Sequence, residues 1–454
     1  MEPPEGPQRP GPAPPPVERE VGMEVYLSRS PGVGGKLRSF PEDFVVEELS
    51  LPPPRFENGR YIAARVRCRN WETNRLVREL SRAMGISRKR IQFAGTKDKR
   101  GVKVQLLTFL ASGEQVASIR LRDFEVLDQY PTDRPLELGH LIGNRFEITL
   151  RGAQGAAEDG RVEGDLKGAG SLREAIGAVG RELEAAGGFP NFFGIQRFGA
   201  LRPVTHKVGE RLVRGDFEGA VMTYVGGPAE FEEPSTQSAR ARLESERDFA
   251  LAVNYYPPHL AFERSLIHHL QLHPGDWTGA LRQLPLNLLM MFVHAYQSRL
   301  FNRTLSRRIL QGLPLSGPVE GDVVLPADAH GRPDHDHYIR VESHNLARVR
   351  EKVSAGTAFV SGVLFGSETA FASGPMGELE RAVIEEAKLS PNDFLVPDLP
   401  EVSSKGTRRE LSIRPGDLAV SFEEGSVVFK FSLPRGCYAT ALLREYVKGQ
   451  VLDY

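Results

Sequence analysis

Residues 60–106 constrain the fold more than any other part of this 454-residue chain, because a strand pattern, a helix pattern and a second strand pattern follow one another there. Alternation over 60–69 predicts a strand with an apolar face and an arginine face. Apolar residues at helical spacing over 76–84 predict a helix that is capped at Asn70 and ends at Gly85. The chain is therefore expected to mix α and β structure.

The loop between the helix and the second strand carries a single carboxylate, Asp98, between Gly95 and Gly101. Three basic side chains crowd around it: Lys97, Lys99 and Arg100. An acid among bases on a tight loop is either an ionised nucleophile for an anionic substrate or a hairpin tip with solvated charges. The local pattern by itself favours the hairpin tip.

The second strand leaves this loop at once. Val102, Val104 and Leu106 alternate with Lys103 and Gln105, which predicts a half-buried strand. Asp98 is thus expected on a rigid loop at a sheet end, beside a basic helix. Loops in such positions often carry functional sites.

Charge is distributed unevenly along the chain. The formal net charge is −1, yet residues 60–103 hold fourteen Lys or Arg against three acids, a local excess of +11, so the remainder carries about −12. Such an excess predicts a cationic surface for a polyanion such as nucleic acid. The alternative is a solvated, salt-bridged face. The shortage of acids nearby in the sequence favours nucleic acid.

Composition excludes several protein classes. Hydrophobic content of 40% and charged content of 26% are typical of a soluble globular protein. No apolar run reaches the roughly 20 residues that span a bilayer, and the N-terminus lacks a secretory pattern. The only cysteines, Cys68 and Cys437, are far apart, which argues against a disulfide framework or a Cys-based zinc site and favours the cytoplasm.

Other segments have clear local patterns. Residues 1–20 contain eight prolines and are expected to form a disordered tail. Helices are predicted over 172–186, over 286–310 and at Ala439–Val447, and a strand over 427–433. The stretch F-P-N-F-F-G-I-Q-R-F-G at Phe189–Gly199 is interpreted as a hydrophobic turn rather than as a direct site.

A histidine-rich segment suggests a metal site. D-H-D-H at Asp334–His337 lies near His330 and His344. Fixed ligand spacing is absent, and alternation would place neighbouring residues on opposite faces. Solvated loop histidines are therefore favoured over a metal site. The sequence also lacks a nucleophile elbow and a dinucleotide fingerprint, so no cofactor is predicted.

Taken together, the motifs resemble those of the TruD family of pseudouridine synthases. The family motif G-x-K-D-K/R-x-A-V-T-x-Q is matched by Gly95–Gln105, with Gly101 and Lys103 in place of its alanine and threonine. Three further motifs match in the family's order: P-E-D-F-V-V-E at Pro41–Glu47, G-N-R-F at Gly143–Phe146 and S-L-P-R-G-C-Y-A-T at Ser432–Thr440. The Phe189–Gly199 stretch matches a fifth motif of the family. The resemblance covers nearly everything from residue 22 onward and is closer to archaeal or eukaryotic members.

The resemblance implies an α+β catalytic core with a mixed, largely antiparallel sheet and an inserted α/β domain. Its segments would be a Pro-rich tail (1–20), the first part of the core (21–188), the TRUD insertion (189–402) and the C-terminal part of the core (403–454). The sheet would contain strands from both ends of the chain.

The resemblance also implies the chemistry. Uridine 13 of transfer RNA would be isomerised to pseudouridine with Asp98 as the nucleophile and without a cofactor. The substrate-binding residues would be Phe44 and Tyr438 on either side of the uracil, Asn144 hydrogen-bonded to it, Phe146 shaping the pocket, and the cations Arg38 and Lys97. The neighbouring Lys97, Lys99 and Arg100 would keep Asp98 ionised, and Arg38 would pair with it. The partner would be transfer RNA, with no membrane and no small-molecule cofactor, and a monomer is compatible with the sequence.

Two other functions fit parts of the sequence. One is an RNA-binding or RNA-chaperone protein whose main role is non-catalytic. An acid in a phosphate-facing basic loop argues against it, because a pure binder gains nothing from Asp98. The other is a metal-dependent hydrolase that uses Asp334–His337.

Overall fold

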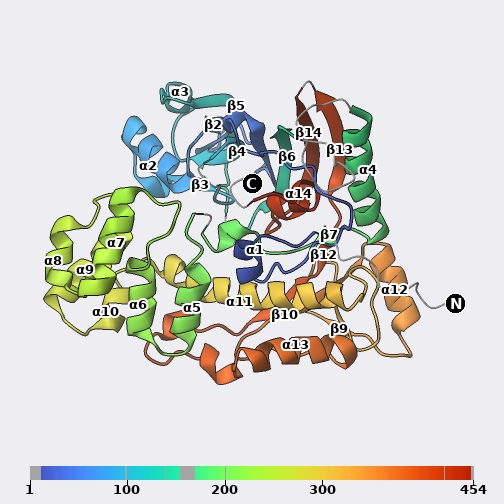
Figure 1. The fold of residues 1–454 in the computed structure, drawn as a ribbon. Helices are drawn as coiled ribbons and strands as arrows, with labels where there is room; N and C mark the ends of the chain where they lie inside the picture. Colours follow the sequence, from blue (N-terminus) through green and yellow to red (C-terminus); the bar gives the residue numbers. More distant parts are fainter. Residues whose placement is uncertain are drawn as a thin grey trace. The chain divides into compact units, whose positions relative to one another are not determined.

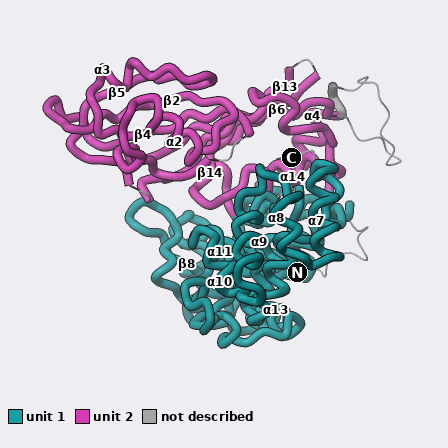
Figure 2. The backbone as a smooth tube through the Cα atoms, turned by 90° about the vertical axis from the view of Figure 1, so that its left-hand side faces the viewer, with its two compact units in different colours: residues 1–29, 182–412 teal, residues 30–181, 413–454 magenta. Residues whose placement is uncertain are grey.

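The computed structural model describes residues 12–97, 100–137, 139–153, 169–199, 201–423 and 425–450 (Figure 1). The chain divides into two compact units, each built from two separate stretches of sequence (Figure 2). Residues 1–29 and 182–412 form unit 1, and residues 30–181 and 413–454 form unit 2. Every residue expected in the uridine site belongs to unit 2.

Unit 2 is organised around one eight-stranded sheet in the order β13-β14-β6-β1-β4-β2-β5, with β3 also paired to β4. The strands are β1 (Phe44–Ser50), β2 (Tyr61–Arg69), β3 (Ile91–Phe93), β4 (Val102–Phe109), β5 (Phe124–Thr132), β6 (Leu141–Arg151), β13 (Gly416–Glu423) and β14 (Ser426–Pro434). Only β1 and β4 pair in parallel; the other pairs are antiparallel. The predicted α+β fold with a mixed, largely antiparallel sheet is confirmed.

Strands from both ends of the chain meet at β6. On one side β1 pairs with β6, with Val46 opposite Phe146 and Glu48 opposite Asn144. On the other side β14 pairs with β6, with Phe431 opposite Phe146. Residues opposite one another in a sheet point to the same side, so these side chains share one face, which we call the inner face.

Two helices cover different parts of the inner face. α2 (Thr73–Met84) packs Leu76, Val77 and Leu80 over the apolar residues of β2 and β4. α14 (Ala439–Val447) packs over β14, where the rings of Tyr446 and Phe429 lie 5.1 Å apart. The strands β1 and β6 lie between the two sheet regions that these helices cover. The remaining helices that begin in unit 2 are η1 (Pro41–Asp43), η2 (Arg88–Arg90), α3 (Gly113–Ala117) and α4 (Ala169–Ala185).

β4 differs from the half-buried strand that its alternation predicts. Lys103 and Gln105, expected on the solvent side, are each only 2% exposed. They lie on the inner face, since Lys103 is opposite Cys68 and Gln105 is opposite Val66 on β2. β4 is central to the sheet, and both of its faces are largely covered.

The start of α2 also differs from the prediction. Glu72, not Asn70, is the N-cap, and its carboxylate accepts hydrogen bonds from the backbone N–H groups of Asn74 and Arg75. Asn70 instead adopts a left-handed conformation with φ of 57°. The predicted end of the helix at Gly85, in the left-handed region with φ of 64°, is confirmed.

Unit 1 is mainly helical around a four-stranded sheet in the order β11-β10-β8-β9. The sheet strands are β8 (Val323–Pro326), β9 (Ile339–Arg340), β10 (Ala358–Leu364) and β11 (Thr407–Glu410); β7 (Phe189–Pro190) precedes them, and β12 (Ser412–Ile413) marks the unit boundary. The helices are α1 (Pro16–Glu20), η3 (Ile195–Arg197), α5 (Thr205–Val213), α6 (Phe217–Val225), α7 (Pro234–Glu246), α8 (Phe249–Tyr255), α9 (Ala261–Leu272), α10 (Trp277–Leu281), α11 (Leu286–Leu310), α12 (Leu346–Ser354), α13 (Gly374–Glu386), η4 (Pro391–Phe394) and η5 (Pro400–Val402). The long helix α11 has the bounds that the sequence predicts.

Two expectations in unit 1 can be compared with the structure. Residues 16–20, assigned above to a disordered tail, form α1 instead; proline at the first helical position favours this start. Residues 1–11 lie outside the described part. The Phe189–Gly199 motif contributes to the interior of unit 1, because Phe189, Phe192 and Phe198 are fully buried.

Candidate active site

Asp98 and its neighbour Lys99 lie outside the described residues. The chain on both sides of them is described, and both ends of the loop are attached to the inner face of unit 2. These attachments show which of the nearby basic side chains are already engaged within the protein.

Lys97 anchors the N-terminal side of the loop. Its backbone N–H donates to Oγ1 of Thr73 at 2.8 Å, at the first residue of α2. Its Nζ lies 2.6 Å from Oε2 of Glu48, and the side chains of Lys97 and Glu48 are only 8% and 1% exposed. Lys97 is therefore half of a buried ion pair with β1, a partner that the sequence did not suggest.

Gly101 anchors the C-terminal side. Its N–H donates to Oδ1 of Asn70 at 3.2 Å, and its carbonyl accepts from the N–H of Asn70 at 2.9 Å. The same carbonyl lies 3.2 Å from the ammonium group of Lys103. Gly101 has φ of +116°, and a Cβ there would lie 2.5 Å from the carbonyl oxygen of Phe44. Glycine is required in this geometry, which accounts for one departure from the TruD motif.

An aromatic cluster lies beside this loop end. The rings of Phe44 and Phe146 meet edge to face with centroids 6.2 Å apart, and Phe146 stacks on Phe431 at 5.3 Å. The guanidinium carbon of Arg38 lies 3.9 Å from the centroid of the Phe44 ring. Arg100 donates from Nη2 to the backbone carbonyl of Arg38 at 3.2 Å. Arg38, Phe44 and Phe146 are thus brought together.

Asn144 lies one cross-strand pair away from this cluster, opposite Glu48 on β1 and Leu433 on β14. Its Oδ1 is buried and accepts no hydrogen bond within the described residues. Tyr438 is half-buried and immediately precedes α14. The turn before it is tied to the start of β6, because the N–H of Arg435 donates to the carbonyl of Ile142 at 3.0 Å.

Two polar residues of the inner face were not assigned a role from the sequence. They are Glu48, which holds Lys97, and Gln105, which was only one letter of a motif match. In each of them one buried oxygen, Oε1, has no hydrogen-bond donor in the described part of the chain. The available sequence signal was position: alternation along β1 places Glu48 on the same face as Phe44, where an apolar residue would be expected.

Positive charge reaches the inner face from Lys97 and Lys103. Burial raises the pKa of the Cys68 thiol to about 11, and both ammonium groups act in the opposite direction by favouring the thiolate. A cationic environment of this kind also favours an ionised carboxylate over a neutral one.

The arginines of β2 are less available than the sequence count suggests. Arg65 pairs with Glu47 and Asp128, Arg67 with Glu125, and Arg69 with Glu42 and Asp123. These acids come from β1, β5 and the segments before them, all outside residues 60–103. The salt-bridged alternative therefore describes this part of the basic segment.

A second group of bases is exposed. Arg88, Lys89 and Arg90 form η2 directly after α2, and none of them makes an ion pair with any described residue. At the other end of α2, the guanidinium of Arg75 lies over the ring of Trp71 at 5.5 Å. We call Arg88–Arg90 the η2 patch.

The histidine-rich segment does not assemble a metal site from described residues: no three His, Cys, Asp or Glu side chains among them are placed to hold an ion. His337 contacts Asp334 at 2.8 Å, and His335 contacts the backbone carbonyl of Arg408 at 2.9 Å. His344 lies 3.2 Å from Glu342.

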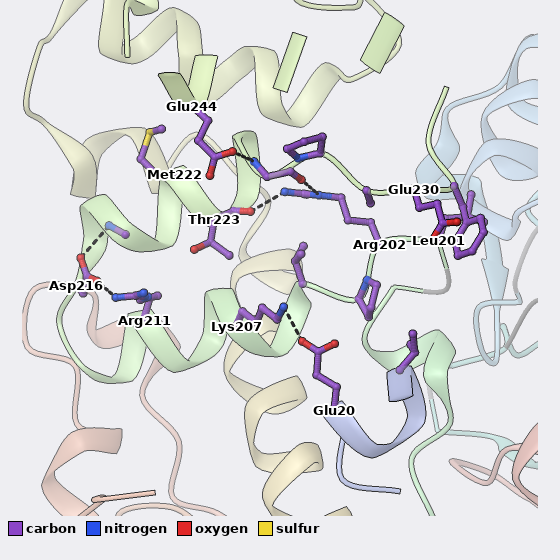
Figure 3. Close-up of a pocket in the computed structure, with 18 of the residues that line it drawn as sticks. Glu20, Leu201, Arg202, Lys207, Arg211, Asp216, Met222, Thr223, Glu230 and Glu244 are labelled. Atoms are coloured by element: carbon purple, nitrogen blue, oxygen red, sulfur yellow. Dashed lines mark hydrogen bonds and ion pairs between the residues drawn. The ribbon is translucent and has the colours of Figure 1, made fainter. Parts of the chain in front are cut away.

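Unit 1 contains a separate cavity of about 720 Å³ between α1, α5, α6 and α7 (Figure 3). Several of its charged groups are paired: Lys207 with Glu20, and Arg211 with Asp216. Arg202 donates to backbone carbonyls at the end of α6, among them that of Thr223 at 2.7 Å. None of the residues predicted for the uridine site lines this cavity. Among the described helices, none is long and apolar enough to span a membrane.

Comparison with known proteins gives a consistent picture. A family model described as tRNA pseudouridine synthase D (TruD) matches residues 20–446. Proteins named "Probable tRNA pseudouridine synthase D" from Methanococcoides burtonii and Halobacterium salinarum are 41% and 40% identical to this chain, and each alignment covers 96% of this chain and 98% of the relative. A crystal structure titled "Putative tRNA pseudouridine synthase D (TruD)" from Methanosarcina mazei has a TM-score of 0.81 at 38% identity, covering 97% of this chain and 99% of that chain.

Proposed function

The chain belongs to the tRNA pseudouridine synthase D (TruD) family, and from that premise we propose that it isomerises uridine 13 of transfer RNA, with Asp98 as the nucleophile. The N1–C1′ bond of the uridine breaks, the uracil turns, and C5 bonds to C1′ in its place. C5 loses a proton and N1 gains one, so the reaction consumes nothing. We also propose the cytoplasm as its compartment, because two distant cysteines suit a reducing environment.

The observation that carries this proposal is the attachment of the Asp98 loop beside the aromatic cluster. Gly101 lies against Phe44, and Phe44 contacts both Phe146 and Arg38. Lys97 ties the other side of the loop to Glu48, the cross-strand neighbour of Asn144. Residues from three motifs far apart in sequence thus surround one part of the inner face.

The site residues then have distinct roles. Asp98 attacks the sugar or stabilises its developing positive charge, for which the carboxylate must be ionised. Lys97 and Arg38 supply positive charge, and Lys97 also fixes the loop. Phe44 and Tyr438 flank the uracil, Asn144 hydrogen-bonds to it and Phe146 shapes the pocket. Flipping the base out of the RNA costs a few kcal/mol, which stacking worth about 1–3 kcal/mol per base offsets.

The η2 patch supplies a surface for the RNA backbone. Its three cations are exposed and unpaired within the described residues, and they follow α2, whose first residue holds the Asp98 loop. Folded RNA is bound largely through its phosphates. We therefore propose that phosphates near the target uridine contact Arg88–Arg90.

The test is pseudouridine mapping on unmodified transfer RNA by chemical adduct formation and primer extension. The wild-type protein should modify uridine 13. Asp98→Asn should bind the RNA with unchanged affinity and form no product. The matched carboxylate-to-amide change at the exposed Asp128 of β5, Asp128→Asn, should retain activity. Product formed by Asp98→Asn would exclude Asp98 as the nucleophile. RNA binding without product from the wild-type chain would favour the non-catalytic alternative.

A further inference from the structure

Three buried polar side chains form a row across three adjacent strands of the inner face. Gln105 is on β4, Glu48 on β1 and Asn144 on β6. Glu48 and Asn144 are directly opposite one another. Glu47 is opposite Val104, so Glu48 and Gln105 are each one residue further along their parallel strands.

Each member of the row has a side-chain oxygen that is buried and accepts no hydrogen bond from the described residues: Oε1 of Gln105, Oε1 of Glu48 and Oδ1 of Asn144. Such an orphaned acceptor costs about 1–3 kcal/mol. Native proteins leave few polar groups in this state, and a group that is so left calls for a functional or solvent partner. Three in one row indicate a shared partner that brings hydrogen-bond donors.

Gln105 occupies a special position in the sheet. β4 pairs with β1 through residues 102–104 and with β3 through residues 107–109. Gln105 lies at the change of partner, where β1 and β3 separate. The loop that begins after β3 brings Lys97 to Glu48 next to this point. At 2% exposure Gln105 is covered, as Phe44 and Phe146 are at 6% and 7%.

We propose that Gln105 binds the flipped uracil, with Oε1 accepting the N3–H and Nε2 donating to an adjacent carbonyl oxygen. The pyrimidine edge of uracil presents an N–H between two carbonyls, and a primary amide presents the complementary acceptor and donor. This assignment rests on the proposed function and adds a base-reading residue on a strand that carries none of the others.

Gln105→Met should keep or raise the stability of the free protein but lower its activity. Methionine has a similar length and removes the orphaned acceptor, so the midpoint of urea unfolding should stay the same or rise. Loss of the contacts with the base should lower kcat/KM for pseudouridine formation about ten- to thirtyfold. If Gln105 only supported the fold, the substitution would lower the stability and the activity of the protein together.

Gln129→Met is the matched control. Gln129 is also in unit 2, on β5, and its Oε1 is likewise buried without a donor among the described residues. Its Nε2 donates to the carbonyl of Gly113, away from β1 and β6. This variant should leave kcat/KM within about twofold of the wild-type value, since no base contact is lost.

A binding experiment identifies the atom that Gln105 reads. Dissociation constants are measured in the Asp98→Asn background for transfer RNA carrying uridine or N3-methyluridine at the target position. The methyl group should weaken binding about tenfold when Gln105 is present and much less in Asp98→Asn/Gln105→Met. The same methyl penalty in both backgrounds, or full activity of Gln105→Met, would overturn the proposal and leave only a bound water at this position. A wild-type protein that makes no pseudouridine would instead overturn the proposed function.

Discussion

Lys97 Nζ and Glu48 Oε2 lie 2.6 Å apart in a buried ion pair that joins the Asp98 loop to β1. A pair of this kind restrains both segments, because separating the charges without water is costly. The loop is held on its other side by Asn70 and Lys103, through the carbonyl of Gly101. The nucleophile proposed here therefore sits on a loop whose two ends are fixed to different strands.

The first prediction concerns this pair. Glu48→Leu or Lys97→Met alone should lower the free energy of unfolding by about 3–5 kcal/mol, because each leaves an uncompensated buried charge. The double variant should recover most of that loss while activity stays low, since the loop is no longer tied to β1. Urea unfolding measures the first effect and single-turnover kinetics the second. Additive destabilisation in the double variant would contradict the pairing. Arg82→Gln, at an exposed pair with Glu79, should cost less than about 1 kcal/mol.

The second prediction concerns Gly101. Gly101→Ala should destabilise unit 2 by about 1–3 kcal/mol, because the new Cβ meets the carbonyl oxygen of Phe44 in a left-handed backbone conformation. Gly85→Ala is the control. Gly85 also has a positive φ, but no atom lies within 4 Å of the place where a Cβ would be added. The control should therefore show a smaller shift in the unfolding midpoint. Equal shifts would mean that the close approach to Phe44 carries no cost.

The third prediction separates the two groups of basic residues by the salt dependence of RNA binding. Changing Arg88, Lys89 and Arg90 together to glutamine should reduce the slope of log K against log salt by up to about 2–3, because each lost phosphate contact removes about 0.7–0.9. The same change at Arg65, Arg67 and Arg69 should alter the slope by less than about 1, since these arginines are paired with acids. Similar changes in slope for both triple variants would remove the distinction between the two groups.

The fourth prediction concerns acid stability of unit 1. Burial lowers the pKa of His206 to about 3, and Arg299 and Lys207 add to this effect. The folded pKa lies below the unfolded value of about 6.5, so the stability that neutral His206 contributes is complete above pH 6.5 and is lost as pH falls toward 3. Within this range, His206 alone lowers the free energy of unfolding by about 1.4 kcal/mol for each pH unit of acidification. His206→Phe, which keeps a ring against Phe198, should flatten stability between pH 6 and 4. An unchanged slope would contradict this.

The fifth prediction concerns thiol reactivity. Cys68 is buried with a pKa of about 11, whereas Cys437 is partly exposed next to Tyr438. An alkylating reagent at pH 8 should therefore modify Cys437 first and reach Cys68 only on unfolding, because the thiolate is the reactive form. Mass spectrometry of peptides after timed quenching gives both rates. Bound transfer RNA should slow the reaction of Cys437 if Tyr438 flanks the uracil.

Helix bounds could be predicted where they depend on neighbouring residues in the sequence. The bounds of α11 and α14 follow from apolar periodicity, and the end of α2 follows from Gly85. The start of α2 was missed because two polar residues, Asn70 and Glu72, can each cap a helix. Asn70 is used instead to hold Gly101, a contact between segments 31 residues apart.

The site was predictable as a set of motif residues but not as a network of contacts. The burial of Lys103 and Gln105 goes with the central position of β4, between β1 and β2 in the sheet, which the alternation within β4 does not reveal. The ion pair of Lys97 with Glu48 joins residues 49 positions apart. The acids that neutralise the arginines of β2 likewise come from strands that precede and follow the basic segment in the sequence. A charge count along the sequence therefore overestimated the cationic surface.

The pairing of β14 with β6 has a consequence for biosynthesis. Phe431 completes the stack on Phe146, and Tyr438 follows a few residues later, so the proposed uridine pocket needs residues that come after the last segment of unit 1, which ends at Ser412. A growing polypeptide that has already folded all of unit 1 still lacks one wall of the uridine pocket. Capacity to modify RNA should accordingly appear only after β14 and Tyr438 have been synthesised, which prevents products truncated before them from acting on transfer RNA.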